Sequence, residues 1–159
     1  MATILIDFDG TCIPTLPMGG MTEYETGAEK VLKKLVKSGH DLVLWTARNN
    51  SSRNPYNVIS NQFFGMTSLE EAVKWFKDRD IPLFGVNEVP GEIDKVGVGR
   101  KALGDYLIDD TAICTPIKFV TIKVYSVITE RTEDFKSFHV DWDLLDLYLK
   151  TLGLIEDED

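Results

Sequence analysis

The sequence predicts an α/β fold of three layers, Rossmann-like, with a mainly parallel central sheet and no large cap domain. Short apolar segments alternate with segments of helical periodicity, and several of the apolar segments end in acidic or hydroxyl side chains. Parallel strands that are buried on both faces have this near-continuous apolar character. No linker divides the chain, so we expect one domain spanning residues 1–159.

The first half of the chain alternates strand, helix and strand. Residues 3–7 are an apolar strand, followed by a loop rich in Pro, Gly and Thr. The pattern Thr26-x-x-Glu29 is a capping box, and the apolar spacing after it predicts a helix that ends at Gly39. Residues 41–45 form the second apolar strand. This order is that of a β-α-β unit.

A long polar insertion precedes the next β-α unit. Residues 49–67 are irregular, and loops of this length are often functional. Their apolar residues suggest a lid or a subunit contact, while a local stabilising role is equally open. Ser68-x-x-Glu71 predicts the start of a helix, and residues 81–86 and 105–109 predict two further strands.

The C-terminal region, residues 118–159, is the least defined by pattern. Residues 118–128 are rich in β-branched side chains and predict one or two strands. Asp141 is the expected N-cap of a last helix. The region could complete the sheet edge or build an interface between copies of the chain.

Composition narrows the classes of function. Hydrophobic residues make up 43% of the chain and charged residues 27%, as in soluble globular proteins. No apolar run reaches the length of a membrane span, and the chain enters a strand without a signal-like segment, which favours a cytoplasmic location. The net charge of −9 argues against general affinity for nucleic acid.

Polar side chains stand at the ends of three predicted strands. Asp7, Thr46 and Asp109 each follow an apolar run. Ligands of open parallel sheets bind beyond the carboxyl ends of the strands, so one site explains all three positions.

The first of these strand ends carries two carboxylates. Asp7 and Asp9 are separated by one residue, and Gly10 then turns the chain. Two carboxylates brought together are unfavourable unless a cation or a shared proton relieves the repulsion. A hard divalent metal, which prefers oxygen ligands, is one relief, and a dyad with one protonated carboxyl is the other.

At this point the chain resembles the haloacid dehalogenase-like (HAD) phosphatase superfamily, and within it a small bacterial or phage branch without a large cap. The matching pieces, in the family's order, are Asp7-Phe8-Asp9-Gly10-Thr11, Thr46, Lys101 and Asp109-Asp110. The resemblance implies that Asp7 is a nucleophile that forms an aspartyl-phosphate, and that Asp9 is the general acid and base.

The resemblance also implies a Mg²⁺ site and a phosphate pocket. The metal would be held by Asp7, the backbone carbonyl of Asp9, Asp109 and Asp110. The phosphate would be bound by residues of the first three motifs, namely Gly10, Thr11, Thr46, Ala47 and Lys101. Gly10 is expected to let the loop amides point toward the phosphate. For Arg48 and Arg53 an ordinary surface role is expected, with contact to the substrate as the alternative.

The function expected from these residues is Mg²⁺-dependent hydrolysis of a phosphomonoester, acting on a small metabolite or a nucleotide. Two alternatives stay open. One is a catalytically idle phosphoryl-binding or assembly module on the same scaffold, and the other is phosphotransfer to an acceptor other than water. Homo-oligomer formation is also left open by the sequence.

Overall fold

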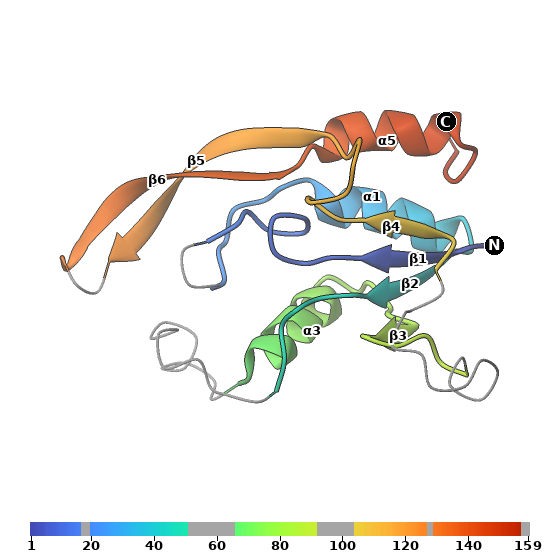
Figure 1. Cartoon of the computed structure of the whole chain (residues 1–159), viewed down its shortest axis with the longest axis horizontal. Helices are drawn as coiled ribbons and strands as arrows, with labels where there is room; N and C mark the ends of the chain where they lie inside the picture. The colour runs from blue at the N-terminus through green and yellow to red at the C-terminus, as the bar shows by residue number, and fades with distance from the viewer. Residues whose placement is uncertain (17–19, 51–65, 92–103, 127–128, 157–159) are drawn as a thin grey trace.

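The computed structural model describes residues 1–16, 20–50, 66–91, 104–126 and 129–156 (Figure 1). Its central sheet is built from four short strands, which are β1 (Thr3–Ile6), β2 (Asp41–Leu44), β3 (Gly85–Val86) and β4 (Tyr106–Ile108). The strand order is β3-β2-β1-β4, and every pairing is parallel. The predicted α/β class with a mainly parallel sheet is confirmed.

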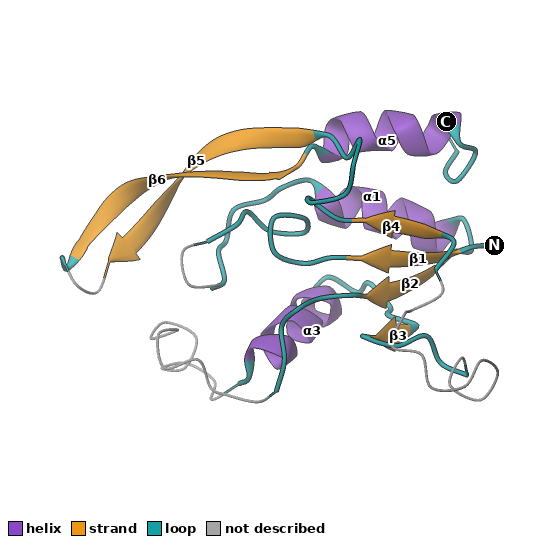
Figure 2. Cartoon of the chain, in the orientation of Figure 1, coloured by secondary structure: helices purple, strands orange, loops and turns teal. Residues whose placement is uncertain are grey.

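Helices α1 (Ala28–Lys37), α3 (Ser68–Asp78) and α5 (Trp142–Thr151) accompany the sheet (Figure 2). Their buried side chains join those of β1 and β2 in one apolar cluster, whose largest members include Ile4, Ile6, Leu32, Leu35, Leu42, Leu44, Phe76 and Trp142. Leu5 and Val43 point to the other side of the sheet and are buried as well. Burial on both faces explains why β1 and β2 read as continuous apolar runs.

The strands of the central sheet are shorter than the sequence predicts. The first strand ends at Ile6 rather than residue 7, and the segment predicted at 81–86 pairs with β2 only over Gly85–Val86. The described part of the chain contains no cap domain and no helix long and apolar enough to span a bilayer.

Two helix starts differ from the predicted capping boxes. Gly27, with φ +90°, is the N-cap of α1, because the Thr26 hydroxyl donates to the carbonyl of Cys12 (2.7 Å) and accepts from the N–H of Ala28. The box of α3 is formed by Thr67 and Glu70, one residue earlier than predicted. The hydroxyl of Thr26 thus ties the end of the loop back to its beginning.

The C-terminal region forms a hairpin and a helix. Strands β5 (Ile117–Ser126) and β6 (Arg131–Val140) pair with each other in a separate antiparallel sheet that projects from the body (Figure 1). In the described residues this hairpin does not extend the central sheet, so the expectation of a completed sheet edge is wrong. Asp141 caps α5 as predicted, accepting from the N–H of Leu144 (3.2 Å).

The base of the hairpin is fastened to the loop that follows β1. Val140 donates its N–H to the carbonyl of Gly10 (2.9 Å), and Thr15 donates to the carbonyl of Phe138 (3.1 Å). The indole Nε1 of Trp142 donates to the carbonyl of Thr11 (2.9 Å). The C-terminal region therefore holds the backbone of the Asp7–Thr11 loop in place through hydrogen bonds to the carbonyls of Gly10 and Thr11.

Candidate functional site

The carboxyl ends of β1 and β4 lie side by side because the two strands pair in register. Ile6 is opposite Ile108, and the N–H of Asp7 donates to the carbonyl of Ile108 (2.9 Å). Asp7 and Asp109 directly follow the last residues of β1 and β4, so both lie at the same edge of the sheet. The predicted meeting of these two strand ends is confirmed.

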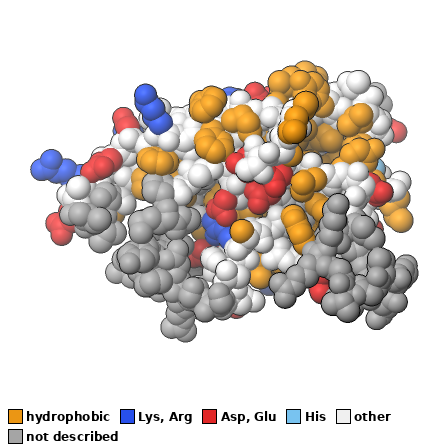
Figure 3. Space-filling view, viewed as in Figure 1, with side chains coloured by type: hydrophobic (Ala, Val, Ile, Leu, Met, Phe, Trp, Pro, Cys, Tyr) orange, Lys and Arg blue, Asp and Glu red, His pale blue; other side chains and the backbone are white. Residues whose placement is uncertain are grey.

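Three carboxylates converge at this edge. Asp7, Asp109 and Asp110 each offer a carboxylate oxygen, and these oxygens all lie within 4.8 Å of one another. We call these three residues the acidic cluster. Acidic side chains also gather near the middle of the face shown in Figure 3. No ion pair formed by the described residues includes a member of the cluster.

The surroundings of the acidic cluster raise the pKa of two of its carboxyl groups. Burial raises the pKa of Asp7 from 3.8 to about 7, and the nearby Asp109 and Asp110 add to the rise, against hydrogen bonds from Phe8 N–H and the Thr11 hydroxyl. The pKa of Asp110 is raised as well, by burial first and then by the charge of Asp109. Such a cluster favours a cation or a proton, as two adjacent carboxylates require.

Gly10 and Thr11 hold the acidic cluster together. A Cβ at Gly10, where φ is +80°, would lie 2.7 Å from Cγ of Asp110, so the cluster is this compact only because the residue is glycine. The buried hydroxyl of Thr11 donates to Oδ2 of Asp7 (3.0 Å) and accepts from the N–H of Asp110 (3.1 Å). It therefore links the ends of β1 and β4.

Four amides of the loop, those of residues 10–13, donate within the loop rather than toward a phosphate, which differs from the expectation for Gly10 and the residues after it. Gly10 donates to the carbonyl of Ile13, while Thr11, Cys12 and Ile13 all donate to the carbonyl of Phe8. The loop closes on itself because its buried amides need acceptors, and the nearest ones are its own carbonyls.

Arg48 is buried and belongs to the site, so the expected surface role is wrong. Its side chain is 6% exposed and forms a two-point ion pair with Asp9, with Nε 2.7 Å from Oδ2 and Nη2 2.6 Å from Oδ1. The Asp9 carboxylate consequently lies in this pair rather than in the acidic cluster. Sequence reasoning named Arg48 but did not predict its pair with Asp9; its position two residues after Thr46, at a strand end, was the available signal.

The end of β2 is held by hydrogen bonds to neighbouring loops. Thr46 donates its N–H to Oδ1 of Asn87 (2.8 Å), and its hydroxyl accepts from the N–H of Arg48 (3.2 Å). Asn87, directly after β3, is a second residue of this edge that the sequence did not single out. Ala47 is exposed beside them. Phosphate binding by Thr46 and Ala47 stays a prediction.

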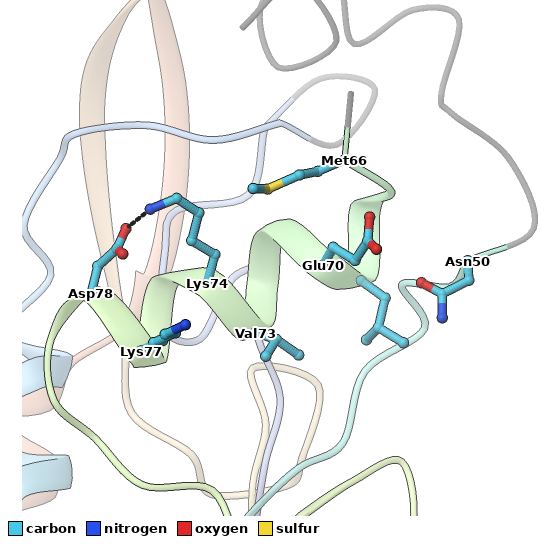
Figure 4. A pocket seen from close by; sticks show the side chains of 8 residues that line it. Asn50, Met66, Glu70, Val73, Lys74, Lys77 and Asp78 are labelled. Carbon is cyan, nitrogen blue, oxygen red and sulfur yellow. Dashed lines mark hydrogen bonds and ion pairs between the residues drawn. The ribbon is translucent and has the colours of Figure 1, made fainter. Parts of the chain in front are cut away.

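Lys101 and most of the 49–67 loop lie outside the described residues, and the roles expected for them stay predictions. A groove of about 410 Å³ lies along the outer side of α3 and is drawn in Figure 4. It is lined by Asn50, Met66, Leu69, Glu70, Val73, Lys74, Lys77 and Asp78. None of these residues belongs to the acidic cluster, so the chemistry indicated by the strand ends is not located in this groove.

Comparisons with known proteins support the fold. No known family profile matches the chain, and no curated protein matches it. A solved structure of a conserved protein coded by a locus of Bacteroides thetaiotaomicron is similar, with 28% sequence identity and a TM-score of 0.53. The similarity covers 70% of this chain and 78% of that chain. The two proteins therefore share the α/β arrangement across most of their lengths.

Proposed function

We propose that this chain is a Mg²⁺-dependent phosphomonoester hydrolase of the HAD-like type. The observation that carries the proposal is the acidic cluster, in which Asp7 from β1 meets Asp109 and Asp110 from the end of β4. A half-buried carboxylate nucleophile, a group of oxygen ligands and an adjacent acid/base residue on one sheet edge are the parts from which this chemistry can be built.

The acidic cluster fits a hard divalent cation. Its donors are all carboxylate oxygens, its spacing allows several of them to reach one ion, and the pKa values of Asp7 and Asp110 are raised chiefly by burial and further by neighbouring carboxylates. Asp7, Asp109 and Asp110 would hold Mg²⁺, with the backbone carbonyl of Asp9 as a further ligand. When bound, the ion would offset the carboxylate charge and orient the phosphoryl group.

The reaction divides into two displacements at phosphorus. An oxygen of Asp7 attacks, a bond forms between that oxygen and phosphorus, and the bond to the ester oxygen breaks. Asp9 donates a proton to the departing alkoxide and then removes one from the water that hydrolyses the aspartyl-phosphate. Phosphate leaves, and Asp7 regains its carboxylate. Thr46 and Lys101 would bind the phosphoryl oxygens during both steps.

The substrate proposed is a phosphorylated small metabolite or nucleotide. The acidic chain has little general attraction for a polyanion such as nucleic acid. A local metal would reverse the field at the strand ends, so that a compact phosphate ester could still bind there.

The test is hydrolysis of a panel of phosphomonoesters with and without Mg²⁺. We expect phosphate release that requires Mg²⁺ and falls at least about 10³-fold in Asp7→Asn, because the covalent route is removed. Asp143→Asn, an exposed carboxylate 88% accessible in its side chain, is the matched control and should retain activity.

The outcome separates the proposal from its alternatives. Consumption of substrate without matching phosphate release would indicate transfer to another acceptor. Binding of phosphate analogues without turnover or a phosphoenzyme on the whole panel would contradict hydrolysis and favour a binding module.

A further inference from the structure

We propose that Arg48 is a positioning residue that fixes Asp9 for proton transfer. The inference rests on the proposed phosphatase function and on the geometry of one buried ion pair. Both oxygens of the Asp9 carboxylate accept from the Arg48 guanidinium, at 2.7 and 2.6 Å. A planar fork that donates to both oxygens sets the orientation of the carboxylate plane as well as its distance.

The guanidinium of Arg48 is itself held in one place. Nη2 also donates to the carbonyl of Gly20 (2.7 Å), and Nη1 donates to the carbonyl of Ser68 (3.3 Å) and to Oε2 of Glu71 (3.5 Å). The ring of Phe8 lies 4.7 Å from Cζ. These contacts come from the loop after β1 and from the start of α3, so Arg48 joins Asp9 to two separate parts of the fold.

Arg48 therefore acts through Asp9 rather than by touching a phosphate. Each of its three guanidinium nitrogens already donates to an acceptor among the described residues. An arginine that bound the phosphoryl group directly would need donors directed to solvent, and its side chain would not be 6% exposed.

The ion pair leaves Asp9 accessible to a substrate. The Asp9 side chain is 34% exposed, whereas its partner is almost completely buried, so Arg48 holds the carboxylate from its inner side. A carboxylate has about four lone-pair positions, and the pair uses two of them. The remaining positions can face a departing ester oxygen or an attacking water.

Glu71 is the third member of this arrangement. It is 7% exposed in the first turn of α3, although carboxylates are rarely buried without a partner. Its contact with Arg48 explains why the α3 capping box uses Glu70 in place of Glu71. In this arrangement Arg48 orients Asp9, the proton-transfer group, and Glu71 in turn orients Arg48.

The test compares two esters that differ in their need for a proton. 4-Nitrophenyl phosphate has a leaving group that departs without protonation, whereas benzyl phosphate, similar in size, does not. We expect Arg48→Lys to lower kcat/KM for benzyl phosphate about 100-fold, the cost of displacing a catalytic group by about 1 Å. For 4-nitrophenyl phosphate the loss should stay within about 5-fold, since proton donation contributes little there.

Arg79→Lys is the matched control. Arg79 follows α3, pairs with Glu25 at 3.0 Å and Glu29 at 3.4 Å, and lies over the ring of Trp75, but it does not contact Asp9. Arg79→Lys should change kcat/KM for the two esters equally and only slightly. In an Asp9→Asn background, Arg48→Lys should cause no further loss, because the group it positions is already gone.

Equal losses on both esters, or an added loss of similar size in Asp9→Asn, would overturn the inference in favour of a purely structural role. If Arg48→Lys does not fold, Glu71→Gln, which keeps the shape of the side chain, should show a smaller loss selective for benzyl phosphate, and an unselective loss would contradict the inference. A wild-type protein that hydrolyses no ester of the panel, these two included, would overturn the proposed function and this inference with it.

Discussion

Asp7→Asn should stabilise the metal-free protein at neutral and alkaline pH. Folding raises the pKa of Asp7 from 3.8 to about 7, so the native state favours the protonated carboxyl. The contribution of Asp7 to the free energy of unfolding is therefore largest below about pH 3.8 and falls as the pH rises toward 7, where the ionised carboxylate is partly buried against its neighbours. Asparagine has no such charge and can still accept from the Thr11 hydroxyl.

The size of the effect follows from the pKa. A pKa change of one corresponds to about 1.4 kcal/mol, so a rise from 3.8 to about 7 sets an upper limit of about 4 kcal/mol. Because water reaches part of this carboxyl and screens its charge, we expect about 2 kcal/mol. For a chain of this size that corresponds to an increase in Tm of about 4–8 °C.

The assay is thermal and urea unfolding of both proteins in chelator, at pH 8 and at pH 4. The variant should be the more stable at pH 8, and its advantage should shrink toward pH 4. Added Mg²⁺ should raise the stability of the wild type more than that of the variant, because it binds the native cluster. Equal stabilities in chelator at pH 8, or an advantage that does not change with pH, would refute the electrostatic reasoning.

Three further predictions concern the frame of the site. Gly10→Ala should lower the free energy of unfolding by about 2–3 kcal/mol and weaken Mg²⁺ binding in calorimetry, whereas Gly39→Ala, with φ +81° and no atom within 4 Å, should show only the backbone cost of about 1 kcal/mol. Asp146→Asn should cost about 1 kcal/mol at pH 7. Burial raises the pKa of that carboxyl, but hydrogen bonds and charges from two lysines outweigh it and leave the pKa below 3.8, so the difference from wild type should vanish as pH falls below that value. Trp142→Phe should cost about 1–2 kcal/mol in urea unfolding, since the buried carbonyl of Thr11 loses its donor; an unchanged midpoint would contradict that assignment.

The alternation of apolar runs and helical segments was sufficient to predict the α/β class and the edge at which the acidic residues meet. Asp7 and Asp109 could be placed together without coordinates, because parallel strands end at one edge of their sheet. The turn at Gly10 was equally readable, since a glycine after a buried strand marks a backbone reversal. These features depend on neighbours in sequence or on a rule common to all parallel sheets.

The tertiary structure alone decided the surroundings of Asp9. Arg48 is 39 residues from Asp9 in the sequence, and Glu71 is farther still. The two residues belong to different elements of the fold, and nothing in the sequence around either of them indicates that it is buried. Their burial is favourable only because each finds a charged partner, and such a partner is supplied by packing rather than by sequence proximity.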